Sequence, residues 1–93
     1  KKRRDFLVSR INEMDKISCI MPKGAFYVFA NIKKTGLSAE EFAERLLEKE
    51  HVAVIPGSNF SKNASGYVRI SYGTSMEKIE DGLNRMERFL KSL

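Results

Sequence analysis

The sequence predicts an α+β fold in which a small, mainly antiparallel sheet is covered on one face by helices. Short β-branched and aromatic runs alternate with longer segments of helical periodicity, and capping signals open two of the longer segments. No repeat, low-complexity tract or long linker divides the 93 residues, so they form a single domain, residues 1–93, with one modest core. We expect strands at residues 25–30, 52–55 and 67–72, and helices near residues 3–14, 39–50 and 75–92.

The first helix is predicted over residues 3–14, where apolar residues recur at helical spacing. These residues are Phe6, Leu7, Ile11 and Met14. No capping residue precedes the segment, and the chain begins with Lys1 instead of Met. Together these features predict that the 93 residues are a piece of a longer chain.

Two strands separated by a turn are expected next. Ile17, Cys19 and Met21 alternate with polar or smaller neighbours, which is typical of a short strand, and the PKG tripeptide at residues 22–24 is typical of a turn. The run AFYVFA at residues 25–30 is too apolar for a half-exposed strand. It should therefore be central in the sheet or covered on both faces.

A capping box predicts the start of the second helix. Ser38 stands where an N-cap is expected, and Glu41 follows three positions later. The helix should run over residues 39–50 and present one apolar face. That face comprises Phe42, Ala43, Leu46 and Leu47.

The second half of the chain predicts two strands and a loop. The run VAVI at residues 52–55 is expected to be a short buried strand halted by Pro56 and Gly57, and the polar residues 58–66 form a loop. The strand at residues 67–72 alternates in polarity. One face should carry Val68, Ile70 and Tyr72, and the other Tyr67, Arg69 and Ser71.

The last helix should begin at Thr74, which we expect to be its cap, with Glu77 three positions on. Apolar residues then step by three and four along one stripe, which indicates a core-facing side. The stripe comprises Met76, Ile79, Leu83, Met86, Leu90 and Leu93.

Composition excludes several classes of function. The net charge of +5 is local, because the KKRR run at residues 1–4 holds four of the 17 basic residues. Lone Cys19 and His51 exclude a disulfide framework and a four-ligand zinc site. We expect no metal, and no apolar run is long enough to span a membrane, so the cytoplasm is the expected location.

Two basic residues are candidates for chemistry. Lys62 follows Ser61, as lysines that bind pyridoxal phosphate often follow a hydroxyl residue, but its polar surroundings indicate an exposed loop. Arg69 lies between Val68 and Ile70 on the polar side of its strand. It could pair with a surface carboxylate of the same chain, or clamp the carboxylate or phosphate of a ligand.

Three blocks, PKGAFYVF at residues 22–29, VIPGSNF at 54–60 and GYVRISY at 66–72, occur in this order. With them the chain resembles the carboxy-terminal small domain of class I/II pyridoxal-phosphate aminotransferases, the aspartate aminotransferase-like group of fold type I. The likeness extends from the first helix to the last. Relatives often have Gly where Ser61 stands and Ala where Gly73 stands, so the loop geometry is expected to differ.

The resemblance implies an enzyme that moves an amino group between an amino acid and a 2-oxo acid through pyridoxal phosphate. It implies that Arg69 forms a bidentate pair with the substrate α-carboxylate, and that Phe26 lies near the substrate or in the core. Pro56, Gly57 and Ser58 would shape the turn that faces the cleft.

The same resemblance implies that the cofactor-binding residues are absent here. The Schiff-base lysine, the aspartate that pairs with the pyridine nitrogen and the phosphate-binding groups belong to the large domain of the family. We therefore expect this chain alone to be inactive, the open face of its sheet to meet the large domain, and the longer parent protein to be a homodimer. An independent module that binds an anionic partner such as RNA is the alternative, although the motif typical of RNA-recognition domains is incomplete around Arg69.

Overall fold

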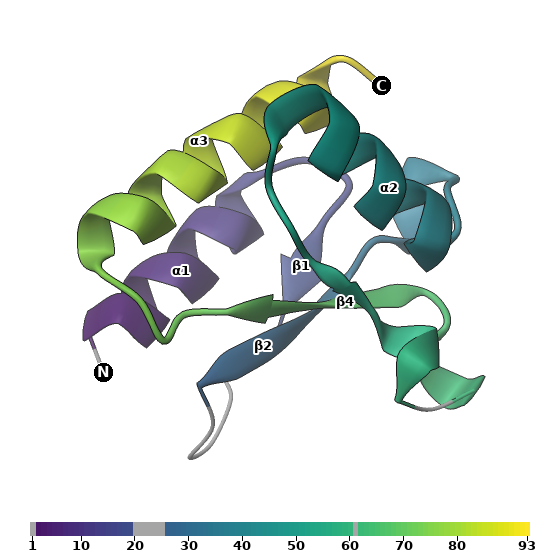
Figure 1. Ribbon diagram of the computed structural model, residues 1–93, viewed down its shortest axis with the longest axis horizontal. Coiled ribbons are helices and arrows are strands. Elements are labelled where there is room, and N and C mark those ends of the chain that lie inside the picture. The colour runs from purple at the N-terminus through teal and green to yellow at the C-terminus, as the bar shows by residue number, and fades with distance from the viewer. Residues whose placement is uncertain (1, 20–25, 61) are drawn as a thin grey trace.

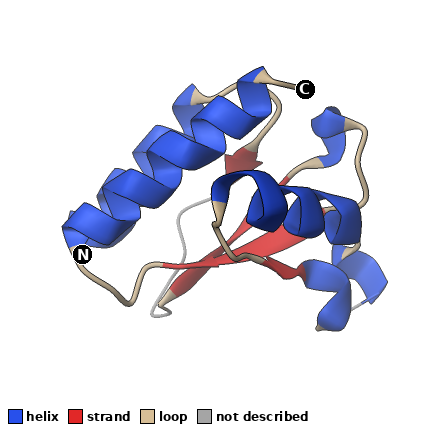
Figure 2. Ribbon diagram, turned by 45° about the horizontal axis from the view of Figure 1, so that its top comes forward, coloured by secondary structure: helices blue, strands red, loops and turns tan. Residues whose placement is uncertain are grey.

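The computed structural model describes residues 2–19, 26–60 and 62–93. Within these residues three α-helices lie on one side of a four-stranded antiparallel sheet (Figure 1 and Figure 2). The helices are α1 (Lys2–Glu13), α2 (Ala39–Glu50) and α3 (Met76–Lys91). The strands are β1 (Ser18–Cys19), β2 (Tyr27–Asn31), β3 (Ile55–Pro56) and β4 (Tyr67–Ser71). The predicted α+β class and the placement of all three helices are confirmed.

The two long strands, β2 and β4, form the centre of the sheet, whose strand order is β1-β2-β4-β3. Their register pairs Val28 with Ile70 and Ala30 with Val68. These four side chains face the helices and are buried. Because strand side chains alternate between faces, their neighbours lie on the open face of the sheet.

The segment at residues 25–30 is central, as predicted, but the structure covers only one of its faces. Tyr27 and Phe29 are each 37% exposed on the side away from the helices. Part of the segment preceding it, the predicted turn at residues 22–24 with Met21 and Ala25, lies outside the described residues.

The expected strand at residues 52–55 is wrong in position. Pairing with β4 involves Ile55 and Pro56, which oppose Arg69 and Val68. Pro56 therefore belongs to the strand instead of halting it. Because β3 is the edge strand of the sheet, no further strand requires the N–H group that proline lacks.

Helix α2 begins as predicted. The Ser38 Oγ accepts a hydrogen bond from the Glu41 N–H at 3.1 Å, and the Glu41 carboxylate accepts one from the Ser38 N–H at 3.4 Å. The inclusion of Leu47 in its buried face is wrong, because this side chain is 51% exposed. Leu47 lies about 100° around the helix from buried Leu46, which turns it toward solvent.

Helix α3 is capped by Ser75 and not by Thr74. The Ser75 Oγ accepts a hydrogen bond from the Lys78 N–H at 3.3 Å. Four members of the predicted stripe are buried, but Met76, the first residue of the helix, and Leu93, two residues beyond its end, are 37% and 38% exposed. Phe89 is buried instead, and its ring meets that of Phe42 edge-on at 5.4 Å. The core thus joins α2 to α3 through two aromatic rings.

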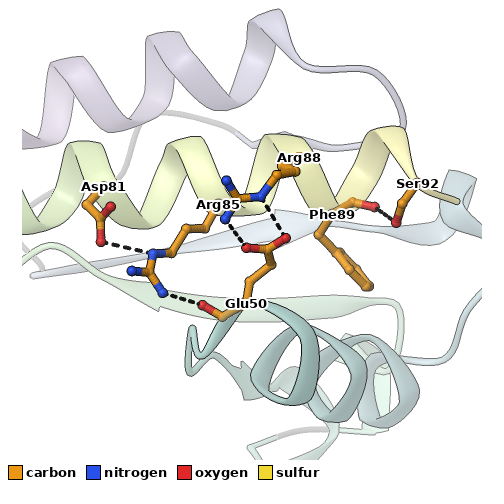
Figure 3. Close-up of polar contacts among 6 residues, drawn as sticks. All are labelled: Glu50, Asp81, Arg85, Arg88, Phe89 and Ser92. Atoms are coloured by element: carbon orange, nitrogen blue, oxygen red, sulfur yellow. Dashed lines mark hydrogen bonds and ion pairs between the residues drawn. The ribbon is translucent and has the colours of Figure 1, made fainter.

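Polar contacts also fasten the end of α2 to α3 (Figure 3). The Glu50 carboxylate accepts hydrogen bonds from the Nε and Nη2 atoms of Arg88, the first at 2.9 Å. Arg85 donates to the Glu50 main-chain oxygen at 2.8 Å and pairs with Asp81 at 3.1 Å. The hydrogen bonds from Arg88 lower the pKa of Glu50 below the ordinary glutamate value.

Replacing Glu50 with Gln should therefore destabilise the fold in a pH-dependent way. A carboxylate with a lowered pKa stabilises the folded state above its unfolded pKa, and that contribution is lost as the pH falls through the folded pKa. We expect Glu50→Gln to lower the urea midpoint at about pH 7 and to match the parent more closely at about pH 3. Glu48→Gln on the same helix is the control, and an equal loss in both variants would contradict the prediction.

Close backbone packing surrounds Gly57, at the start of the 3₁₀ turn η2 (Gly57–Asn59). A Cβ atom at this position would collide with the main-chain oxygen of Ala64 and lie 2.8 Å from that of Tyr67. The turn that follows β3 can approach Ala64 and Tyr67 this closely because Gly57 has no side chain.

Gly57→Ala should lower the free energy of unfolding by about 1–3 kcal/mol, because two rigid main-chain oxygens must move. Gly82→Ala is the matched control. Nothing lies within 4 Å of a Cβ at Gly82, which is inside α3, so alanine there should stabilise by about 0.5–1 kcal/mol. Urea unfolding of both variants tests this, and equal stability of the two would refute it.

Candidate functional site

Arg69 lies in the middle of β4, with its side chain on the open face of the sheet. Val68 and Ile70 on either side of it are buried against the helices, so the predicted division of this strand into two faces is confirmed. Its Cα partners are Phe29 on β2 and Ile55 on β3. Arg69 is therefore flanked on both sides by apolar side chains of neighbouring strands.

Two aromatic rings contact the Arg69 guanidinium. Its central carbon lies 4.8 Å from the ring centre of Tyr27 and 4.4 Å from that of Phe60, both within the range of a cation–π interaction. Phe29 connects these rings, with centres 5.7 Å from Tyr27 and 6.2 Å from Phe60 and both pairs edge-to-face. We call Tyr27, Phe29 and Phe60 the aromatic platform.

Arg69 forms no ion pair with any of the described carboxylates. The sequence has no Asp or Glu between residues 16 and 39 or between residues 51 and 76, and these two stretches include every described strand. Among the described residues, the ion pairs involve Arg4, Arg10, Arg45, Arg85 and Arg88, and Arg69 is in none of them. One of the two interpretations of Arg69 is an ion pair with a carboxylate of its own chain. No such pair is observed among the described residues.

Phe26, which directly precedes β2, is the most exposed of the large apolar side chains among the described residues, at 72%. Its ring lies 6.4 Å from that of Tyr72, and its main-chain oxygen accepts the Tyr72 N–H at 2.9 Å. The structure therefore does not place Phe26 in the core. It lies beside Tyr27, which contacts Arg69.

The turn after β3 is tied to helix α2. The Ser58 hydroxyl donates a hydrogen bond to the carboxylate of Glu40 in the first turn of α2, and this bond is the main cause of the lowered pKa of Glu40. The Phe60 N–H donates to the Gly57 oxygen at 2.9 Å. Phe60 is thereby held at the end of a turn whose base is fixed to the helical layer.

Sequence reasoning placed Arg69 on the correct face but did not identify Tyr27 and Phe60 as its contacts. The signal for Tyr27 is the antiparallel register, which pairs Tyr27 with Ser71, two residues after Arg69. Such diagonal positions lie within reach of long side chains. Phe60 comes from a turn, and no periodicity relates it to the strand.

The other sequence candidates carry no site. Lys62 is exposed, as expected. Cys19 is partly buried against the core, and burial raises the pKa of its thiol, which disfavours the reactive thiolate. None of the helices formed by the described residues is long and apolar enough to cross a membrane.

Comparison with known proteins identifies the family. The family model described as aminotransferase class I and II matches residues 1–86. The chain is 52% identical over 90 residues to an aspartate aminotransferase of Pyrococcus horikoshii, a match that covers 97% of this chain and 23% of that relative. The chain thus spans about a quarter of the length of this relative.

Solved structures agree with this result. The aromatic aminotransferase of Pyrococcus horikoshii superposes with a TM-score of 0.94 and 49% identity, over 98% of this chain and 24% of that one. A PLP-dependent aminotransferase of Streptococcus suis gives a TM-score of 0.87 and 27% identity, over 98% of this chain and 24% of that one. Because the family model covers nearly the whole sequence and the fold superposes closely, the chain belongs to the aminotransferase class I and II family.

Proposed function

We propose that the parent protein is a pyridoxal-phosphate-dependent aminotransferase and that these 93 residues are its C-terminal small domain, which binds the α-carboxylate of the substrate through Arg69. The observation that carries this proposal is an arginine on the open face of the sheet with no carboxylate partner among the described residues. The similar proteins named above are aminotransferases, and their names include both aspartate and aromatic substrates.

A bidentate contact explains why arginine suits this position. The planar guanidinium presents parallel N–H groups that match the two oxygens of a carboxylate. Every α-amino acid and every 2-oxo acid carries such a carboxylate next to the reacting carbon. Arg69 would therefore bind the part that both substrates of a transamination share and orient the reacting carbon. The choice of amino acid would depend on other residues, with Phe26 as the candidate on this chain.

The described residues do not fit the cofactor itself. Pyridoxal phosphate supplies the electron sink for amino-group transfer and is held through a lysine whose pKa is lowered by desolvation. All described lysines are exposed: Lys2, Lys16, Lys33, Lys34, Lys49, Lys62, Lys78 and Lys91. We infer that the large domain of the parent protein provides that lysine and that the 93-residue chain alone does not transaminate.

The open face of the sheet is the surface we propose to meet that large domain. Tyr27, Phe29, Ile55 and Phe60 expose between 37% and 50% of their area there. Apolar side chains gathered on one surface favour a contact with another part of the protein. A homodimeric parent in the cytoplasm remains part of the proposal. RNA binding, the alternative, has no support among the similar proteins, which are named as aminotransferases.

Substituting Arg69 in the full-length parent tests the proposed function. Arg69→Ala should lower kcat/KM for the best amino donor by at least about one to two orders of magnitude, because a charge-assisted hydrogen bond contributes roughly 1.5–3 kcal/mol. Arg69→Lys keeps the charge but loses the bidentate geometry, so it should fall between Arg69→Ala and the parent. Steady-state kinetics with a panel of amino acids and 2-oxoglutarate measures both effects.

Arg45→Ala is the matched control, since Arg45 is an exposed arginine on α2 paired with Glu41. We expect it to leave the kinetics unchanged. Cofactor absorbance should survive in all three variants, because no cofactor contact is assigned to either arginine. An Arg69→Ala enzyme of parental efficiency, or one that loses cofactor, would show that Arg69 does not bind the carboxylate.

A further inference from the structure

We propose that Tyr27 and Phe60 are positioning residues that hold the Arg69 guanidinium in place for an incoming carboxylate. This inference rests on the proposed function of Arg69 and assigns roles to two residues beyond it. The rings approach the same guanidinium to 4.8 Å and 4.4 Å from different parts of the chain. Tyr27 comes from the neighbouring strand β2, and Phe60 from the turn that follows β3.

The contact restrains Arg69 without using the groups that bind substrate. Arginine has a flexible side chain, and fixing its rotamers costs conformational entropy. In a preorganised site this cost is met on folding, so it does not weaken substrate binding. A carboxylate partner would restrain the side chain but would occupy its N–H donors. An aromatic ring attracts the cation through its π-electrons instead, so the donors stay available for a carboxylate.

Both rings are themselves held. Tyr27 is the first residue of β2, one of the two central strands, and its register with Ser71 places it diagonally to Arg69. Phe60 follows η2, which is anchored by the close packing of Gly57 and by the hydrogen bond from Ser58 to Glu40. The edge-to-face contacts with Phe29 connect the two rings. A residue that positions another must itself be held rigidly, and these contacts hold both rings.

The experiment replaces each ring by leucine in the full-length parent, with the best amino donor as the probe. Tyr27→Leu and Phe60→Leu should each raise the KM for the donor about two- to five-fold and leave kcat nearly unchanged, as expected from the strength of exposed cation–π contacts. Tyr27→Phe and Phe60→Tyr keep an aromatic ring and should restore the parental KM. Leucine variants with the same KM as the parent would overturn the proposal.

A double-mutant cycle separates positioning from a direct or structural role. Combined with Arg69→Ala, the leucine substitutions should cause no further rise in KM, because no guanidinium is left to position. A further rise of the same size would mean that the rings act on substrate or on folding, and it would reject the proposal. Thermal unfolding of each variant accompanies the kinetics, and a KM that rises only together with a large fall in the unfolding midpoint would indicate a structural role and reject positioning.

Phe6→Leu is the matched control. The Phe6 ring also lies under an arginine, with the central carbon of Arg10 5.8 Å from its centre, but it is on α1, in the helical layer. This variant should keep the parental KM. If Arg69→Ala impairs the enzyme and the leucine variants do not, the positioning role of the two rings is rejected while the proposed function of Arg69 stands. If Arg69→Ala has no effect, the proposed function fails and the positioning role fails with it.

Discussion

The register in which β4 pairs with β2 determines which side chains this domain buries and which it presents. Val28 pairs with Ile70 and Ala30 with Val68, and these four residues form the sheet side of the core. Since successive side chains alternate between faces, burying Val68 and Ile70 places Arg69 on the opposite side. A slip of one residue would turn the charged guanidinium into the core, which is strongly unfavourable without a partner.

The helical layer fixes the surroundings of that arginine as well as the core. The Phe42–Phe89 ring pair and the contacts of Arg85 and Arg88 with Glu50 hold α2 against α3. Helix α2 in turn binds the turn after β3 through the hydrogen bond between Ser58 and Glu40. The position of Phe60 over Arg69 therefore depends on contacts made on the far side of the sheet. This links packing between helices to the geometry of the open face.

Charge is divided between the two layers in a way that suits an anion-binding surface. All acidic residues lie at residues 5–15, 40–50 and 77–87, in or next to the three α-helices, and every ion pair among the described residues joins residues of these helices. The strands contribute one arginine surrounded by aromatic rings. The open face thus presents a guanidinium that forms no ion pair with the described residues, and the described lysines are all exposed.

Local signals in the sequence determined much of this fold. The capping box at Ser38 and the apolar periodicities located the helices, and the alternation around Arg69 placed its side chain on the open face, because these patterns act within a few residues. The ordered blocks also indicated the aminotransferase family, which the comparisons established.

Tertiary contacts decided the remaining features. Pro56 is part of β3 because that strand is at the sheet edge, and Ser75 caps α3 while the Thr74 main-chain oxygen accepts a hydrogen bond from Arg3 of α1. The rings of Tyr27 and Phe60 meet at Arg69 through a strand register and a turn anchored on α2. Residues so far apart in sequence come into contact only when the strands pair and the helices pack on the sheet, so no local sequence pattern predicts their contact.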